Sequence, residues 1–306
     1  MTEQQRLSLL IKKRAEELGF SACGIVKAEA VKASVRREFE EWIAQGAHGE
    51  MGYMARNLEK RMDPTLLVEG CRSIVVVAQN YYPTTASPHI SRYAQGKDYH
   101  RVVKDKLFQL LEYINTITPT KGRAFCDSAP VLERYWAVQA GLGTCGRNRQ
   151  LIIPGCGTHF FLGELFIDAE AEYDTPLKES LCNGCNACIR NCPTGALSEN
   201  GFDARQCLSY LTIEYRGELP TATGEQLGGC FYGCDRCQSA CPHNRAAKPH
   251  NEPQFTPSDE LLTMSESNWK ELTKEKFDTL FKDSAVKRCG YEQFMRNIEA
   301  ISSKKQ

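Results

Sequence analysis

The spacing of the cysteines constrains this chain more than any other feature of its sequence. Its 306 residues include 15 cysteines, and nine of them fall between Cys182 and Cys241. Residues 182–193 follow the pattern C-x2-C-x2-C-x3-C-P. Three thiolates at this spacing can surround one corner of an iron–sulfur cubane, and the cysteine before proline points away toward a second cluster. The pattern predicts a segment that holds two [4Fe–4S] clusters.

A second cysteine run, C-x2-C-x3-C-P, is incomplete and covers residues 234–242. The position three before Cys234 is Phe231, so one ligand must come from elsewhere, and the candidates are Cys207 and Cys230. The predicted ligands of the first cluster are Cys182, Cys185, Cys188 and Cys241. Those of the second are Cys192, Cys234, Cys237 and one of the two candidates. Structural zinc is the alternative, but zinc sites usually use CxxC pairs with a longer gap.

Charge and hydropathy exclude several classes of protein. Lys plus Arg and Asp plus Glu both number 38, so the chain is not a globally basic nucleic-acid binder, although a local basic patch is compatible with this balance. No apolar run approaches the roughly 18 residues of a membrane helix. The charged N-terminus lacks the apolar region of a secretory signal. We therefore expect a cytoplasmic chain without a membrane partner, in which thiols stay reduced and bind metal.

The order of predicted elements indicates an α/β or α+β domain over residues 1–172. A cluster-binding segment follows over 173–250, and a mostly polar, helical tail over 251–306. Periodicity predicts helices over 3–18, 31–45, 102–117 and 131–143. β-branched and apolar runs predict strands over 22–26, 73–82 and 122–127, and two strands joined by a Pro-Gly turn over 151–168.

One family matches several long stretches of this sequence. Residues 126–168, CDSAPVLERYWAVQAGLGTCGRNRQLIIPGCGTHFFLGELFID, resemble the epoxyqueuosine reductases, cobalamin and iron–sulfur enzymes of tRNA modification. The resemblance continues in DARQCLSYLTIEYRG (203–217) and YGCDRCQSACPHN (232–244), and more weakly in residues 51–64 and 92–100. It implies an α+β fold, in which an α/β-type cobalamin-binding domain precedes a ferredoxin-like double [4Fe–4S] domain and a short helical tail.

The resemblance also implies a reaction and its cofactors. The family reduces epoxyqueuosine to queuosine at the wobble position of tRNA, a two-electron deoxygenation. Cob(II)alamin, reduced to cob(I)alamin through two [4Fe–4S] clusters, supplies the electrons. Longer members carry a C-terminal helical repeat domain that helps to hold the tRNA, and this chain ends where that domain would begin. It is therefore expected to be a short form.

Site residues follow from the same resemblance. Asp127 matches the proton donor, whereas its pattern alone is that of a turn or helix N-cap. To act as an acid near neutral pH, its pKa must rise above the ordinary value of about 3.9. Cys207, and not Cys230, matches the remaining cluster ligand. Cys126 and Cys145 are expected to be spare core thiols, and the alternative is that they are exposed sites of oxidation. The positions that match cobalamin contacts are Arg61, Asp127, Arg134, Leu151, Ile153, Leu162, Ser209, Gly233 and Cys234. By pattern alone, the aliphatic residues among them are core residues and the arginines are surface charges.

The expected partners are tRNA carrying epoxyqueuosine and an external low-potential donor, a ferredoxin or flavodoxin, and the chain is expected to be a monomer. Arg216 matches a tRNA contact. Because the net charge is zero, the tRNA requires a local basic patch, although a solvated charged face is the simpler explanation. The candidate groups are Arg92, Lys97, His100, Arg101, Lys104 and Lys106; Arg147 and Arg149; and His243, Arg245, Lys248 and His250.

His100 lies in DYHRVV, which has valine where the D-x-H-x-x-G motif of histidine-ligated cobalamin has glycine. We therefore expect His100 to line the active site or cap the following helix. Two other functions are compatible with the residues: a ferredoxin-type electron-transfer protein with the N-terminal part as a docking module, and another corrinoid-dependent reductase such as a dehalogenase.

Overall fold

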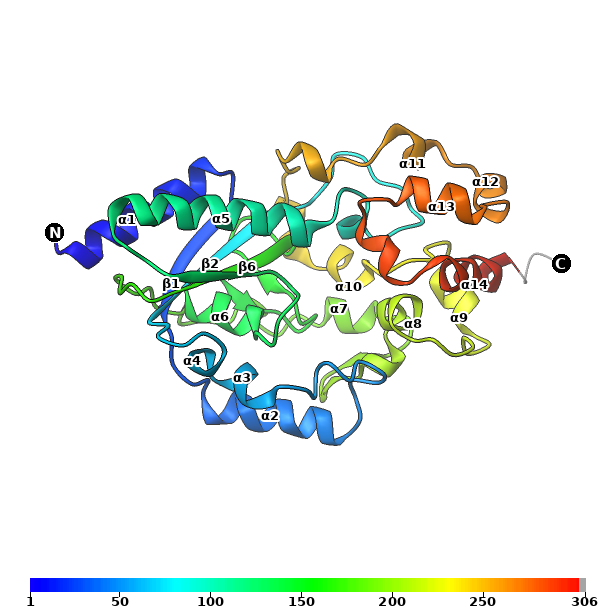
Figure 1. Cartoon of the computed structure of the whole chain (residues 1–306). Helices are drawn as coiled ribbons and strands as arrows, with labels where there is room; N and C mark the ends of the chain where they lie inside the picture. The colour runs from blue at the N-terminus through cyan, green and yellow to red at the C-terminus, as the bar shows by residue number, and fades with distance from the viewer. Residues whose placement is uncertain (303–306) are drawn as a thin grey trace.

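A computed structural model describes residues 1–302 of the chain. Its centre is a four-stranded sheet in the order β1-β2-β6-β3, formed by β1 (Ala22–Lys27), β2 (Ser73–Asn80), β6 (Phe160–Ile167) and β3 (Gly122–Phe125) (Figure 1). Each neighbouring pair of strands is antiparallel. Of the two fold classes that the element order allowed, the antiparallel sheet makes this one α+β.

Helices cover both faces of the sheet. Side chains alternate along β6, so Phe161 and Leu165 join one core while Leu162 and Phe166 join the other. Helices α1 (Glu3–Glu17) and α5 (Tyr99–Ile117) cover the first face, and α6 (Glu133–Gln139) packs on the second (Figure 1). The sheet is thus buried on both sides, which explains why β2 is an almost unbroken run of buried residues.

The remaining elements are short. Near α6 lie α2 (Ala33–Ala44), α3 (Leu58–Met62), α4 (Pro64–Leu67) and a two-stranded sheet of β4 (Thr144–Cys145) and β5 (Leu151–Ile152). The cysteine-rich part contains α7 (Ala187–Arg190), β7 (Leu197–Ser198), β8 (Gly201–Phe202), α8 (Leu208–Ile213), α9 (Thr223–Leu227) and α10 (Arg236–Ser239). The C-terminal part contains α11 (Asp259–Thr263), α12 (Glu266–Lys270), α13 (Lys274–Leu280) and α14 (Tyr291–Ser302). The 3₁₀ helices are η1 (Arg92–Ala94), η2 (Ala204–Gln206), η3 (Pro242–Ala246), η4 (Pro253–Phe255) and η5 (Ala285–Arg288).

Most predicted elements are present, with two differences. α5 begins at Tyr99, because the Asp98 side chain accepts the backbone N–H of His100 at 3.0 Å and caps the helix there. The two strands predicted within 151–168 are present as β5 and β6, but they do not pair with each other. β5 pairs with β4, whereas β6 lies between β2 and β3. The turn between them closes locally through Ile153 and Gly157, and β6, apolar on both faces, takes a central place in the large sheet.

The C-terminal helices share a core with earlier parts of the chain. Residues of α12, α13 and α14 pack with Ile90 and Ala94, from the segment after β2, and with Phe231 and Tyr232, from the cysteine-rich part. Figure 1 shows α14 beside α9 and α8. Residues 251–302 are therefore integrated with the two preceding parts.

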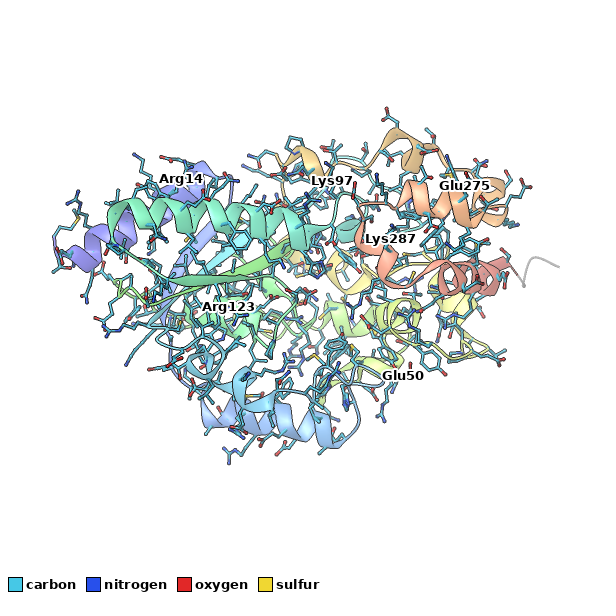
Figure 2. All side chains as sticks on the ribbon, in the orientation of Figure 1. Arg14, Glu50, Lys97, Arg123, Glu275 and Lys287 are labelled. Carbon is cyan, nitrogen blue, oxygen red and sulfur yellow. The ribbon has the colours of Figure 1, made fainter. Side chains whose placement is uncertain are left out.

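Charged side chains lie along the outline of the molecule. In Figure 2 the labelled Arg14 and Glu275 lie toward opposite ends of the upper layer, and Lys287 lies above the middle of the molecule. None of the helices within residues 1–302 is both long enough and apolar enough to cross a membrane.

Phe294 tests how far the C-terminal core contributes to stability. Its ring is fully buried and lies 5.2 Å from Phe231 and 5.2 Å from Phe277, measured between ring centroids. Phe294→Ala should lower the free energy of unfolding by about 3–5 kcal/mol, because it leaves a cavity among aromatic rings. Phe108→Ala, at a position 49% exposed, should change it by less than about 0.5 kcal/mol. Anaerobic denaturant unfolding followed by circular dichroism measures both; equal effects would contradict this assignment.

Candidate active site and iron–sulfur centres

The structure gathers Cys182, Cys185, Cys188 and Cys241 around one cavity. The first three come from the loop before α7 and from α7 itself, and Cys241 comes from the end of the second run. Cys182 and Cys241 each raise the pKa of the Cys188 thiol, after desolvation, which is the larger cause. The Cys182 sulfur also accepts the backbone N–H of Arg147 at 3.4 Å. This set is the one that ferredoxin spacing predicts for one cubane.

The other set gathers Cys192, Cys207, Cys234 and Cys237. Burial and then the neighbouring Cys234, Cys207, Cys188 and Cys192 raise the pKa of the Cys237 thiol. Burial raises the pKa of Cys234 to about 11, with Cys207 contributing. A cation at the centre of this set would favour the thiolate forms, and an iron–sulfur cluster would supply that charge. Cys188, which belongs to the first set, also raises the pKa of Cys237 in the second set, so the two sets are neighbours.

The spare thiols differ in their surroundings. The Cys230 sulfur donates to the carbonyls of Tyr232, at 3.5 Å, and Gly233, at 3.7 Å. Cys126 is buried, as expected of a core thiol, whereas Cys145 is exposed, so the prediction that it is a core thiol is wrong. Within residues 1–302, no three His, Cys, Asp or Glu side chains are placed to hold a single metal ion; the first set of cysteines instead lines a cavity.

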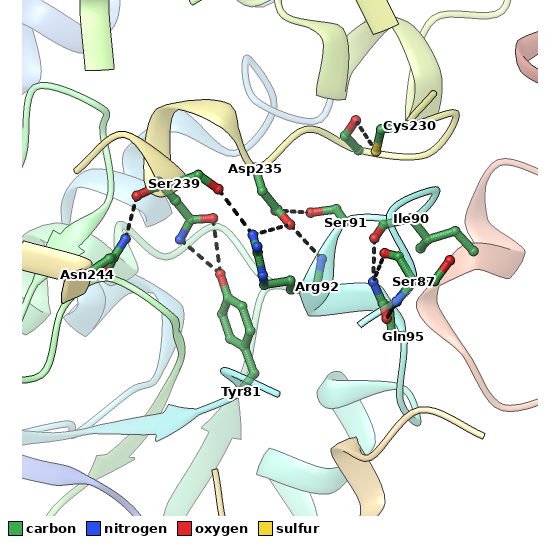
Figure 3. Close-up of polar contacts among 12 residues, drawn as sticks. Tyr81, Ser87, Ile90, Ser91, Arg92, Gln95, Cys230, Asp235, Ser239 and Asn244 are labelled. Carbon is green, nitrogen blue, oxygen red and sulfur yellow. Dashed lines mark hydrogen bonds and ion pairs between the residues drawn. The ribbon is translucent and has the colours of Figure 1, made fainter. Parts of the chain in front are cut away.

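Asp235, between Cys234 and Cys237, attaches the second cysteine run to the segment after β2 (Figure 3). Its carboxylate accepts the Ser91 hydroxyl, the Arg92 backbone N–H at 2.9 Å and the Arg92 guanidinium at 3.2 Å. Gly233 has φ +75°, and a Cβ there would lie 2.5 Å from the Cβ of Ser91. Only glycine allows this close approach.

Two cations of the predicted basic patch are engaged within the molecule. Arg92 pairs with Asp235, and Lys106 pairs with Glu252 at 2.5 Å, with both side chains of the second pair largely buried. Arg101, in contrast, has an 82% exposed side chain. The patch available at the surface is therefore smaller than the sequence indicates.

Asp127 follows β3 directly and has a left-handed backbone, φ +50°. Its carboxylate accepts the Tyr99 hydroxyl and lies 3.8 Å from Nε2 of His100. His100 stacks on Tyr99, and its Nδ1 is held by Asp98 at 2.6 Å. The Asp127 side chain is 62% exposed. The prediction that His100 lines the site therefore has a geometric basis, and an aspartate, a tyrosine and a histidine converge at one accessible point.

Two glutamates beside Asp127 were missed by sequence reasoning. Glu133 Oε1 accepts the backbone N–H of Asp127 at 2.5 Å. Glu164, in the middle of β6, is fully buried. Desolvation, and then the neighbouring carboxylates, raises the pKa of Glu133 to about 8 and raises that of Glu164. The signal was present in FFLGELFID, where one glutamate interrupts an apolar strand.

Arg61 is buried, with 6% of its surface exposed. Its guanidinium donates to the Tyr53 carbonyl at 3.0 Å, while Nε has no partner among the residues described. Burial lowers its pKa. A buried guanidinium without a carboxylate suits a ligand rich in amide carbonyls and phosphate, as cobalamin is. The unpartnered Nε is therefore a donor that such a ligand would satisfy.

The other predicted cobalamin positions are distributed over both halves. Leu151, Ile153 and Leu162 belong to one buried core, on the α6 face of the sheet. Arg134 lies exposed on α6 and donates to the Arg149 carbonyl at 2.5 Å. Ser209 on α8 and Cys234 are half-buried, and the buried Gly233 donates its N–H to the Thr212 hydroxyl at 3.0 Å.

Arg216, the predicted tRNA contact, is engaged by the C-terminal part. Its guanidinium donates to the Cys289 carbonyl at 2.6 Å, the Arg288 carbonyl at 3.1 Å and the Gln293 side chain. Its backbone N–H donates to the carboxylate of Glu50 at 3.1 Å. Figure 2 shows the labelled Glu50 in the lower part of the molecule.

Comparison with known proteins places these features. A family model described as "Epoxyqueuosine reductase QueG, DUF1730" matches residues 61–128, and one described as "4Fe-4S double cluster binding domain" matches residues 181–244. An epoxyqueuosine reductase of Cyclobacterium marinum is 42% identical over 311 residues, which cover 99% of each chain. The chain belongs to the epoxyqueuosine reductase family.

Solved epoxyqueuosine reductases share the fold. One, in complex with an epoxyqueuosine-modified tRNA-Tyr stem loop, has a TM-score of 0.87 at 26% identity, covering 97% of this chain and 80% of the other. The Bacillus subtilis enzyme, with its catalytic aspartate loop swung out of the active site, has a TM-score of 0.86 at 25% identity over 97% and 81%.

As an epoxyqueuosine reductase, the chain is an oxidoreductase with two [4Fe–4S] clusters and cobalamin as cofactors. The near-full-length identity decides against the two other functions, a separate electron-transfer protein and a dehalogenase.

Iron content distinguishes Cys207 from Cys230. Cys207→Ser should lose the second cluster, about four of about eight iron atoms, because it removes one thiolate from that set. Cys230→Ser should keep the full iron content, since the Cys230 thiol donates hydrogen bonds to backbone carbonyls and is not in the predicted ligand set. Iron and sulfide assays on anaerobically reconstituted protein give the answer, and the reverse outcome would exchange the two assignments.

Proposed function

We propose that this chain reduces epoxyqueuosine to queuosine in tRNA and that Asp127 is the proton donor. The observation that carries the proposal is the position of Asp127, accessible at the end of β3 and contacted by Tyr99 and His100. Removing the epoxide oxygen breaks two C–O bonds, takes up two electrons and two protons, and releases water. A protonated carboxyl at this point provides the first proton to the oxygen as it departs.

The surrounding residues prepare that proton transfer. The Tyr99 hydroxyl fixes one carboxyl oxygen of Asp127, so that the other oxygen is available to the substrate. His100, held through Nδ1 by Asp98, lies within reach of proton exchange with Asp127. Bound cobalamin supplies the electrons for the deoxygenation, and the residues proposed to hold it are Arg61, Asp127, Arg134, Leu151, Ile153, Leu162, Ser209, Gly233 and Cys234.

The cluster assignment is part of the same proposal. One [4Fe–4S] cluster takes Cys182, Cys185, Cys188 and Cys241, and the other takes Cys192, Cys207, Cys234 and Cys237. The cavity lined by the first four thiols supports the first assignment. The second assignment is supported by the proximity of its thiols, since after desolvation Cys234, Cys207 and Cys192 raise the pKa of Cys237. Because the sets are neighbours, electrons can pass from one cluster to the other before they reach the cobalamin.

The substrate is proposed to be an anticodon stem loop, as in the solved relative. Arg101, exposed and next to His100 in sequence, and Arg216 are proposed phosphate contacts. Arg216 would have to exchange at least one carbonyl partner for the phosphate. We further propose a cytoplasmic, monomeric enzyme that takes electrons from a ferredoxin or flavodoxin, because thiols that bind iron must stay reduced.

Asp127→Asn tests the proton donor. The amide fits the same space but is not an acid, so turnover should fall at least about 100-fold while cobalamin and iron contents stay unchanged. Asp259→Asn, a matched change at an exposed position of α11, should keep the wild-type rate. The assay is anaerobic conversion of epoxyqueuosine-containing tRNA followed by nucleoside analysis. An undiminished rate for Asp127→Asn would remove Asp127 from this role.

A further inference from the structure

The Asp127 loop, residues 126–132, connects β3 to α6 and is held at Asp127 by one carboxyl group. Asp127 has φ +50°, a conformation that costs energy for any residue with a side chain. The bond from its backbone N–H to Glu133 Oε1, at 2.5 Å, offsets that cost. The position of the Asp127 carboxyl therefore depends on where Glu133 lies.

Glu133 in turn faces a second carboxyl. Glu164 is directly opposite Val76 on β2 and Phe125 on β3, so its immediate neighbours in the sheet are apolar. In the part of the chain that the structure describes, no N–H or O–H is placed to donate to either Glu164 oxygen. Glu133 is its neighbour on the α6 side. A buried carboxylate without a donor is unfavourable, and two adjacent ones are more so.

We propose that Glu133 and Glu164 share one proton and that this carboxyl pair holds the Asp127 loop in its catalytic position. With Glu164 protonated, its O–H donates to Glu133, which remains an anion and accepts the Asp127 N–H. The pair then carries a single negative charge, and each polar atom that needs a partner has one. Glu133 and Glu164 are positioning residues, since they act through Asp127.

The charged groups around the pair favour this state. Asp127 on the loop opposes a second negative charge on the pair, and the pKa of the buried Cys126 thiol is raised by desolvation and by the nearby carboxyl groups, so Cys126 adds no charge. Arg134 is a surface cation on α6, and its charge lowers the pKa of Glu133. Lys104, on α5, acts on Cys126. Loss of the shared proton as pH rises through about 8 leaves two anions in the pocket and weakens the bond to Asp127.

The sign of the pH dependence follows from the raised pKa. In the unfolded chain both carboxyls ionise near the ordinary value of 4.5, whereas in the folded protein the pair keeps one proton until the pH rises through about 8. The stability that the shared proton provides is thus complete at low pH and is lost as pH rises through this interval. Glu164→Gln removes the second titrating group but keeps an N–H donor for Glu133.

Hydrogen exchange of the Asp127 loop in the anaerobic holoenzyme tests the proposal. Glu133→Ala should speed exchange in peptides covering 126–132 at least about tenfold at pH 7. Glu133→Gln, which keeps an acceptor, and Gln139→Ala, at the far end of α6, should stay within about twofold of wild type. Corrected for intrinsic exchange rates, wild-type protection should fall between pH 7 and 9, whereas Glu164→Gln should keep it. Equal exchange in Glu133→Ala and wild type, or the same pH dependence in Glu164→Gln and wild type, would overturn the proposal.

The catalytic consequence rests on Asp127 being the proton donor, and kinetics separate the two ideas. Glu133→Ala should lower kcat with little change in KM for the tRNA, and should add nothing in an Asp127→Asn background. Full activity of Asp127→Asn would reject the proton donor and leave the exchange results standing. If Glu133→Ala does not fold, the pH comparison of wild type with Glu164→Gln decides alone.

Discussion

The carboxylate of Asp235 connects the electron-carrying half of the molecule to the half that contains Asp127. It lies between two cysteines of one proposed cluster and accepts three donors from Ser91 and Arg92, immediately before the segment that leads into α5. α5 begins with Tyr99 and His100, both in contact with Asp127. A few residues therefore separate the cluster attachment from the proposed acid, and the distance between electron source and proton source is fixed by short backbone segments.

Asp235 and Glu164 show opposite uses of a carboxyl group away from water. Asp235 accepts hydrogen bonds from Ser91 and Arg92, and these bonds make it a structural connection between two parts of the chain. Glu164 has no donor within residues 1–302 and apolar strand neighbours, which favour the protonated form. A neutral carboxyl can donate a hydrogen bond, and an anion cannot. An aliphatic residue at position 164 would suit the apolar interior of the sheet. In the proposed pair, the protonated Glu164 instead contributes a hydrogen-bond donor behind the active site.

The features that could be predicted from the sequence are those formed by residues close to one another in the chain. The cluster cysteines follow from spacing, because three thiols within seven residues are brought together by the backbone between them. Strand β2 and helix α5 follow from periodicity. Residues 151–168 show the limit, since both strands were identified but their pairing partners depend on which strand can be buried on two faces. Asp127 came from the family resemblance, and Glu164 was missed, because a carboxyl pair depends on contacts between β6 and α6.

Ion pairs within the molecule reduce the positive charge that is available to bind tRNA. Arg92 and Lys106 were candidates for tRNA binding by sequence, but their charges are neutralised by Asp235 and Glu252, and a cation so paired offers little attraction to a phosphate. Counting Lys and Arg therefore overestimates the charge available near the active site. Arg101 differs because its ion pair with Asp105, at 3.8 Å, lies at the exposed surface. It is a proposed contact for the phosphates beside the modified base, where a few well-placed charges would be sufficient because the proposed reaction takes place on a single nucleoside.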